Sequence, residues 1–151
     1  MRLEISRQAL LSMQHHAEHI YPNECCGFFY GVEGDVRRVE IIQRVQNARE
    51  GDQRRRFQID PRDYQKAEKF ALDHELDLLG VYHSHPDHPA VPSGHDLKVA
   101  MPWFSYIIVS VQDGDTARVR SWRLTDNREF EEEEIAVNEL ENENSTTEKP
   151  T

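Results

Sequence analysis

The segment from Leu78 to Pro86, Leu-Leu-Gly-Val-Tyr-His-Ser-His-Pro, constrains the fold of this chain more than any other. It is largely apolar and rich in residues that favour extended backbone, which predicts a buried central β-strand over 78–85. Pro86 cannot donate to a sheet ladder, so the strand is expected to end there. Side chains two apart in a strand point to the same face, and His83 and His85 are therefore expected to project together from its end.

Helical and strand patterns alternate along the rest of the chain. Apolar residues recur at Leu10, Met13, Ala17 and Ile20, a spacing that predicts a helix over 5–21. The other expected elements are helices over 60–77 and from Ser93 onward, and strands at 26–31, 36–45, 105–111, 117–124 and 129–137. This order predicts an α/β fold: a single mixed domain in which helices flank a central β-sheet.

The length and the charge distribution bound the organisation of the chain. A chain of 151 residues suits one domain. Residues 129–151 hold nine Glu and one Lys, a net charge of −8 out of −10, so residues 1–128 are close to neutral. A near-neutral body argues against nucleic acid as a partner. We expect one domain over 1–137, a solvated acidic run, and a disordered polar tail over 138–151.

The sequence also predicts where the protein resides. No apolar run approaches the ~20 residues that a membrane span requires, and the N-terminus lacks the layout of a secretory signal. Cys25 and Cys26 are adjacent, so they cannot join distant segments. We therefore expect a cytoplasmic protein in a reducing compartment, with no membrane partner. The sequence leaves the oligomeric state open.

The histidine pair has a third potential partner in Asp96. Pro86 ends the strand, and the loop after it returns the chain so that Asp96 enters from the first turn of a helix. Two histidines and one carboxylate with an open fourth position are typical of a catalytic zinc site. Each residue also has an ordinary explanation: the histidines could be plain strand residues, and Ser93 with Asp96 forms a common helix-capping pattern. His88 and His95 are nearby competitors for a metal.

The complete pattern resembles a known family. His-Ser-His-Pro, six residues, then Ser-Gly-His-Asp matches the H-x-H-P-x₆-S-x-x-D signature of the JAMM (MPN+) zinc metalloproteases. Upstream, the sequence Glu-Cys-Cys-Gly at 24–27 is similar to the strand start that carries the family's glutamate. The resemblance extends from residue 1 to about residue 135 in the order of elements as well as in the motif.

This resemblance implies a role for each matching residue. His83, His85 and Asp96 correspond to the ligands of one zinc ion per chain. Glu24 corresponds to the general base that takes a proton from the attacking water, and Ser93 to the hydroxyl that helps to hold the oxyanion.

The resemblance also implies a substrate class. The short form of the chain is similar to bacterial family members that process ubiquitin-like sulfur-carrier proteins, and the Ser-Trp-Arg-Leu segment at 121–124 is reminiscent of that subgroup. The expected reaction is hydrolysis of an amide bond after the Gly-Gly C-terminus of such a carrier.

Two other functions are compatible with parts of the sequence. Cys25 or Cys26 could serve as the nucleophile of a cysteine hydrolase, with a histidine from 83–95 as its base. The chain could also be a non-catalytic scaffold domain of the same fold. The complete set of ligand residues counts against the scaffold.

A polar loop is expected over 46–58, and it carries Arg54, Arg55 and Arg56. The arginine fork suits carboxylates, so these residues are candidates for substrate binding. The alternative is an ordinary solvated connector.

Overall fold

The predicted central strand is β4 (Asp77–Pro86), and all its side chains from Leu79 to Pro86 are buried. It pairs antiparallel with β2 (Cys26–Val32) and parallel with β5 (Ser105–Gln112). The approach of β5 is close at Gly80, where an added Cβ would lie 1.8 Å from the carbonyl oxygen of Ser105. Only glycine fits there, so the glycine within the apolar run sets the spacing of the two parallel strands.

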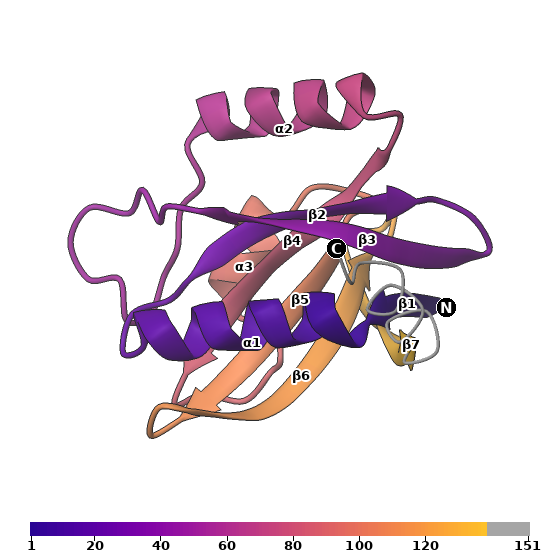
Figure 1. Cartoon of the computed structure of the whole chain (residues 1–151). Coiled ribbons are helices and arrows are strands. Elements are labelled where there is room, and N and C mark those ends of the chain that lie inside the picture. Colours follow the sequence, from indigo (N-terminus) through magenta and orange to yellow (C-terminus); the bar gives the residue numbers. More distant parts are fainter. Residues whose placement is uncertain (139–151) are drawn as a thin grey trace, which may run out of the picture.

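The structure is a computed structural model that describes residues 1–138 (Figure 1). The remaining strands are β1 (Arg2–Ser6), β3 (Val36–Val45), β6 (Asp115–Leu124) and β7 (Phe130–Asn138), and the helices are α1 (Arg7–Ile20), α2 (Pro61–Asp73) and α3 (Gly94–Val99). The single mixed α/β domain predicted from the sequence is therefore present in the described part. The predicted tail lies outside the described residues except for Asn138, which ends β7.

The sheet closes into a barrel, which the prediction of a central β-sheet flanked by helices did not include. Its strand order is β1-β3-β2-β4-β5-β6-β7, and β1 lies parallel to both β3 and β7. Strand β1 was missed because it runs directly into α1, so that Ile5 was assigned to the helix. Leu3 and Ile5 are both buried while their neighbours are not, which is the period of a strand.

Two apolar clusters lie on opposite faces of the strands. One joins Met13 and Ala17 of α1 to residues such as Phe29 and Tyr82. The other joins α2 to the alternate side chains, with Ala71 as one of its members. Figure 1 shows the two helices on different sides of the sheet. The helix predicted over 5–21 is thus confirmed apart from its start.

The second helix ends earlier than predicted. It begins after Asp60, whose side chain accepts a hydrogen bond from the Arg62 N–H, as the Asp-Pro pair indicated. It ends at Asp73 rather than near residue 77, because Glu75 adopts a positive φ of 54° and Asp77 already belongs to β4. No helix of the described residues is long and apolar enough to cross a membrane.

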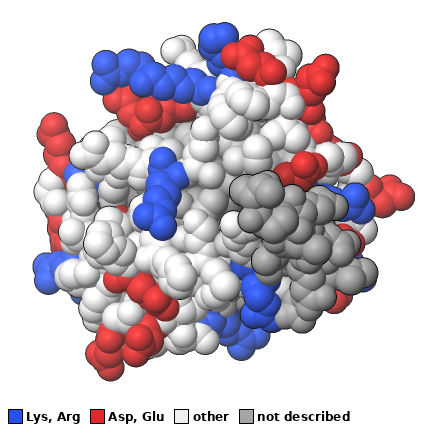
Figure 2. Space-filling view, viewed as in Figure 1, with Lys and Arg blue, Asp and Glu red and all other residues white. Residues whose placement is uncertain are grey.

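The acidic run of β7 is not entirely solvated. Glu133 is buried, and it accepts a hydrogen bond from Ser121 and pairs with Arg123 at 2.7 Å, both on the neighbouring strand. Glu132 pairs with Arg120 through two contacts. Acidic and basic side chains are also interspersed on the face in Figure 2. The run of glutamates therefore serves partly to join β7 to the arginines of β6.

Candidate metal centre

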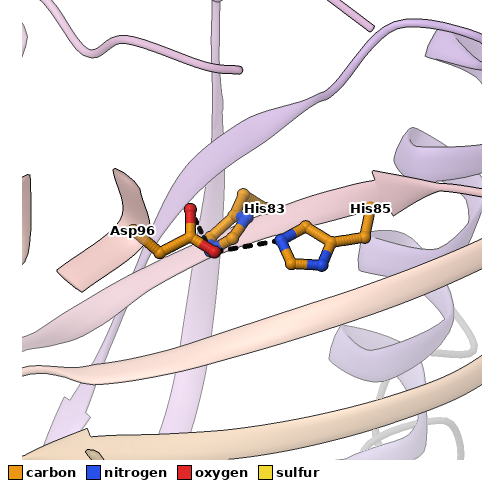
Figure 3. Close-up of side chains that lie close together, drawn as sticks. All are labelled: His83, His85 and Asp96. Carbon is orange, nitrogen blue, oxygen red and sulfur yellow. Dashed lines mark hydrogen bonds and ion pairs between the residues drawn. The ribbon is translucent and has the colours of Figure 1, made fainter. Parts of the chain in front are cut away.

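The end of β4 and the first turn of α3 bring His83, His85 and Asp96 together, as the sequence predicted. All three are buried, and their potential ligand atoms lie within 4.8 Å of one another. Asp96 Oδ2 is 3.0 Å from His85 Nε2, and Asp96 Oδ1 is 4.0 Å from His83 Nε2. Figure 3 shows the carboxylate and the two rings pointing toward a common point.

Asp96 is held in place by the cap of α3. Its backbone N–H donates to Ser93 Oγ at 3.0 Å, and its Oδ2 accepts from the Ser93 N–H at 2.9 Å. The capping pattern was an alternative to a metal-binding role for Asp96, and the structure shows that pattern on Ser93 and Asp96 while the Asp96 carboxylate also faces the two histidines. Burial alone would raise the pKa of Asp96, but His83, His85 and the Ser93 N–H outweigh it and hold that pKa well below its usual range. A carboxylate fixed in its charged form results.

The tautomer of His85 follows from its surroundings. Its Nδ1 lies 2.8 Å from the carbonyl oxygen of Pro89, which can only accept, so Nδ1 carries the proton. Nε2 is then the ring nitrogen that faces the Asp96 carboxylate, at 3.0 Å. A metal ion between Nε2 and the carboxylate would be bound by both.

His83 provides a second indication that a cation belongs here. The residue is fully buried, and neither ring nitrogen has a hydrogen-bond partner among the described residues. Its ring stacks on Phe57 with the centroids 4.5 Å apart. Burial lowers the pKa of His83 to about 4, so the ring is neutral at pH 7. A buried neutral imidazole with two unpaired nitrogens is costly unless one of them coordinates a metal.

Glu24 stands on the other side of His83, between α1 and β2. Its Oε1 is 3.8 Å from His83 Nδ1 and has no hydrogen-bond partner in the described part of the chain. Burial, with a smaller contribution from the Asp96 charge, raises the pKa of Glu24 to about 9. The group therefore contains two buried carboxyl groups beside a neutral His83 ring. The set fits a divalent cation, and its two nitrogens and one oxygen suit zinc.

A cavity of about 480 Å³ opens beside these residues. It is lined by Glu24, Arg55, Arg56, His85, His88, Pro89, Val91, Ser93 and His95. Ser93 Oγ already accepts the Asp96 N–H, so its own proton is free to be donated into the cavity. The group of potential ligand atoms includes neither His88 nor His95.

The three arginines of the loop do not share one position. Arg55 and Arg56 line the cavity, whereas Arg54 is exposed and pairs with Asp52 at 3.2 Å. The loop itself has no helix or strand over 46–58, as predicted.

The two cysteines are poorly placed for nucleophilic catalysis. Both are free and buried. Burial raises the pKa of the Cys25 thiol to about 11 and raises that of Cys26 further. A reactive cysteine needs a lowered pKa and access to solvent, so the structure argues against a cysteine hydrolase.

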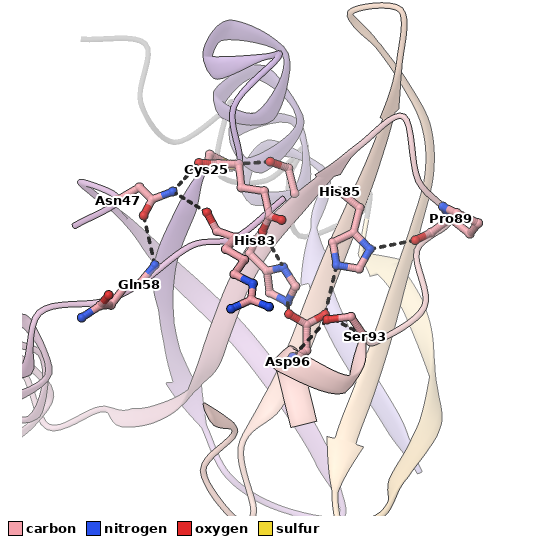
Figure 4. Close-up of polar contacts among 11 residues, drawn as sticks. Cys25, Asn47, Gln58, His83, His85, Pro89, Ser93 and Asp96 are labelled. Carbon is pink, nitrogen blue, oxygen red and sulfur yellow. Dashed lines mark hydrogen bonds and ion pairs between the residues drawn. The ribbon is translucent and has the colours of Figure 1, made fainter. Parts of the chain in front are cut away.

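Sequence reasoning missed several residues that build the site. Gln53 accepts the Glu24 N–H through its backbone oxygen at 2.7 Å, and the Asn47 side chain donates to the Glu24 carbonyl. Phe57 stacks on His83, and its one signal in the sequence was an aromatic residue inside a polar loop. The Pro89 carbonyl, shown beside His85 in Figure 4, had no signal at all because every residue carries a carbonyl.

Comparison with known proteins agrees with this geometry. Residues 6–125 match the family described as prokaryotic homologs of the JAB domain. The chain is 30% identical over 114 residues to a desampylase of Pyrococcus furiosus, covering 76% of each protein. It is also 30% identical over 131 residues to the CysO-cysteine peptidase of Mycobacterium tuberculosis, covering 86% of this chain and 88% of that one.

A solved structure supports the fold across the same region. The solution structure of a protein from Desulfitobacterium hafniense matches with a TM-score of 0.79 and 31% identity, covering 91% of this chain and 93% of the other. The family match over 6–125 includes every residue of the candidate site.

Proposed function

This chain belongs to the prokaryotic JAB-domain family of JAMM-type peptidases, and from that premise we propose that it hydrolyses an amide bond after the Gly-Gly C-terminus of a ubiquitin-like sulfur-carrier protein. One zinc ion per chain, held by His83, His85 and Asp96, is the proposed cofactor. The observation that carries the proposal is the buried group of three ligands beside an unpaired carboxyl group, Glu24.

The chemistry of the proposed reaction divides among a few side chains. Zinc, when bound, lowers the pKa of water to ~7 and polarises the scissile carbonyl. Positive charge at the metal site would offset the burial that raises the pKa of Glu24, so that its carboxylate accepts the proton of the attacking water and delivers it to the leaving amine, acting first as base and then as acid. Ser93 donates its free hydroxyl proton to the oxygen that becomes negative. The Ser93 backbone meanwhile keeps the Asp96 carboxylate in position.

The proposed substrate rests on the relatives and on the cavity. Two relatives bear the names desampylase and CysO-cysteine peptidase. The cavity of about 480 Å³ can receive a short extended segment, and its wall includes Arg55 and Arg56. We propose that these two arginines receive a carboxylate of the carrier or of the released amino acid, because a guanidinium binds carboxylate through two parallel hydrogen bonds. Arg54 has no such role in the proposal.

The proposal is tested with a carrier of defined chemistry. Purified zinc-loaded protein is incubated with a ubiquitin-like carrier whose terminal Gly-Gly is amide-linked to cysteine, and the intact mass of the carrier is followed. Loss of the cysteine residue is expected. A carrier that lacks one terminal glycine is the matched control and should be processed far more slowly.

Two treatments separate this proposal from its alternatives. A chelator should abolish the reaction and added zinc should restore it, whereas a thiol alkylator should have little effect. A non-catalytic scaffold would bind the carrier without any change in its mass. Carrier that stays intact with protein containing one zinc per chain would refute the proposed substrate but not the metal site.

A further inference from the structure

The Ser-Trp-Arg-Leu segment of β6 has two faces with different contacts. Ser121 and Arg123 both bind the buried Glu133 on β7. Trp122 points the other way, and its indole Nε1–H donates to the carbonyl oxygen of Ala90 at 3.0 Å. The first pair joins two strands of the barrel. The tryptophan instead contacts the loop that leads from β4 to α3.

Ala90 follows Pro89, the residue whose carbonyl fixes the tautomer of His85. The Pro89 carbonyl accepts the His85 Nδ1–H at 2.8 Å, and the next carbonyl along the chain accepts the Trp122 indole N–H. The two adjacent carbonyls are thus bound on opposite sides of the loop, one toward the metal centre and one toward the barrel. The two carbonyls belong to adjacent planar peptide units that meet at the Cα of Ala90, so a displacement of Ala90 also shifts the Pro89 carbonyl.

The loop over 87–92 has no helix or strand, so its position depends on such contacts. Its start is held by Asp87, whose carboxylate accepts from the Tyr21 hydroxyl at 2.6 Å and from the Asp113 N–H at 3.0 Å. The Ser110 hydroxyl donates to the carbonyl of His88. Trp122 binds Ala90, and the two neighbours of Ala90, Pro89 and Val91, line the cavity. The contact with Trp122 therefore holds the part of the loop that forms one wall of the cavity.

The indole is itself fixed in place. The Arg120 guanidinium lies 4.6 Å from the centroid of the Trp122 ring, and it makes two hydrogen bonds to the Glu132 carboxylate at 2.7 and 2.8 Å. A cation over an indole face and a bidentate ion pair both restrict the ring. The donor that holds Ala90 is therefore part of an ordered arrangement and not a freely rotating surface group.

We propose that Trp122 is a positioning residue for the metal centre: through Ala90 and Pro89, it holds His85 in the tautomer and orientation that present Nε2 to the ion. The inference rests on the proposed function only in taking His85 as a zinc ligand. It does not depend on which carrier is cleaved.

The test compares two matched substitutions, Trp122→Phe and Trp103→Phe. Both replace an indole by a phenyl ring, but Trp103 is exposed and contributes no side-chain hydrogen bond among those of the described residues. The zinc dissociation constant is measured by competition with a chelator, and the protonated nitrogen of His85 is identified by long-range ¹H–¹⁵N correlation in metal-free protein. Outer partners of metal ligands typically contribute 10–100-fold to affinity, and we expect a loss of about 10-fold in Trp122→Phe. Trp103→Phe should match the wild type.

A second substitution covers the case in which Trp122→Phe fails to fold. Ser110→Ala removes another hydrogen bond to the same loop and should weaken zinc in the same direction, with a mixed His85 tautomer. Wild-type zinc affinity together with an unchanged His85 tautomer in both variants would overturn the positioning role. A wild-type protein that binds no zinc would count instead against the proposed function, so the two failures are distinguishable.

Discussion

The proposed zinc ligands are held by different parts of the molecule, so each can be removed separately. His83 and His85 come from β4, and Asp96 comes from α3. His83→Ala, His85→Ala and Asp96→Ala should each deplete zinc, because two remaining protein ligands bind the ion weakly. Zinc content is measured by atomic emission after gel filtration.

Two histidines provide the controls for this prediction. His88→Ala and His95→Ala should retain one zinc per chain, since neither belongs to the group of ligand atoms. Both line the cavity, so a change in KM for the carrier is compatible with the prediction. Full zinc content in Asp96→Ala would contradict the ligand set.

Glu24 should affect turnover and not metal content. Glu24→Gln keeps the size of the side chain but cannot accept a proton, and kcat is expected to fall by roughly 10²–10⁴-fold with KM little changed. Steady-state kinetics on the carrier substrate and a zinc assay of the same preparation check both parts. If Glu24→Gln loses its zinc, the residue is a ligand and not a base.

The short helix α3 combines capping with a proposed catalytic function. Ser93→Ala removes the acceptor of the Asp96 N–H and the proposed oxyanion donor together. We expect kcat to fall by ~10²–10³-fold and the free energy of unfolding by about 1 kcal/mol. Ser93→Gly is the useful comparison because glycine is a tolerable cap without a hydroxyl. If kcat is preserved in both variants, Ser93 is only a cap.

The loop between β3 and α2 gives a further test of substrate binding. Arg55→Gln with Arg56→Gln should raise KM for the carrier, and the wild-type KM should rise with salt as the ion pairs are screened. Arg54→Gln is the matched control, because Arg54 pairs with Asp52 and does not line the cavity. A wild-type KM in the double variant across a salt series would make the loop a connector only.

The elements differ in how far the sequence could predict them. The grouping of His83 and His85 was predicted because residues two apart on β4 share a face, and Asp96 was added by its spacing in the motif that resembles the JAMM signature. Strand β1 was not predicted, because a few residues of alternating polarity that run directly into a helix give too short a strand pattern. The closure of the barrel was therefore not predicted either, because β1 is the strand that pairs with both β3 and β7.

Contacts between distant residues account for the other misses. Burial of Glu133 depends on Ser121 and Arg123 across the sheet, and a run of glutamates carries no sign of that pairing. The separation of Arg54 from its two neighbours depends on the course of a loop, which no periodicity describes. Contacts made by backbone oxygens, such as that of Pro89 with His85, cannot be predicted from residue types, because every residue has a carbonyl oxygen.

The stability of the whole protein should depend on pH through His16, which joins α1 to the barrel. Its Nδ1 lies 2.8 Å from the hydroxyl of Tyr82, and the ring is buried. Burial, with smaller contributions from Arg44 and His19, lowers the pKa of His16 from 6.5 to about 4. Between those pH values the unfolded chain binds a proton that the folded protein excludes, so stability falls as the pH falls.

The size of this effect can be measured by comparison with His16→Gln. From pH 7 to pH 5 the wild type should lose about 1–2 kcal/mol more of its free energy of unfolding than the variant does. Urea unfolding at the two pH values measures the difference, and the other histidines cancel because both proteins contain them. Equal losses in the two proteins would mean that His16 does not titrate in this range.

The double function proposed for Asp96, as a metal ligand and as part of a helix cap, bears on how such a chain would change if selection for catalysis were relaxed. Asp96 would still be retained, or replaced by another residue that completes the capping box, because its side chain helps to stabilise the first turn of α3 and abundance in the cell depends on stability. His83 has no comparable protection, since a buried ring without hydrogen-bond partners is replaced by an apolar side chain at little cost. In a lineage that has become inactive, His83 should therefore be lost first, and a retained Asp96 would say little about whether the ancestor was an enzyme.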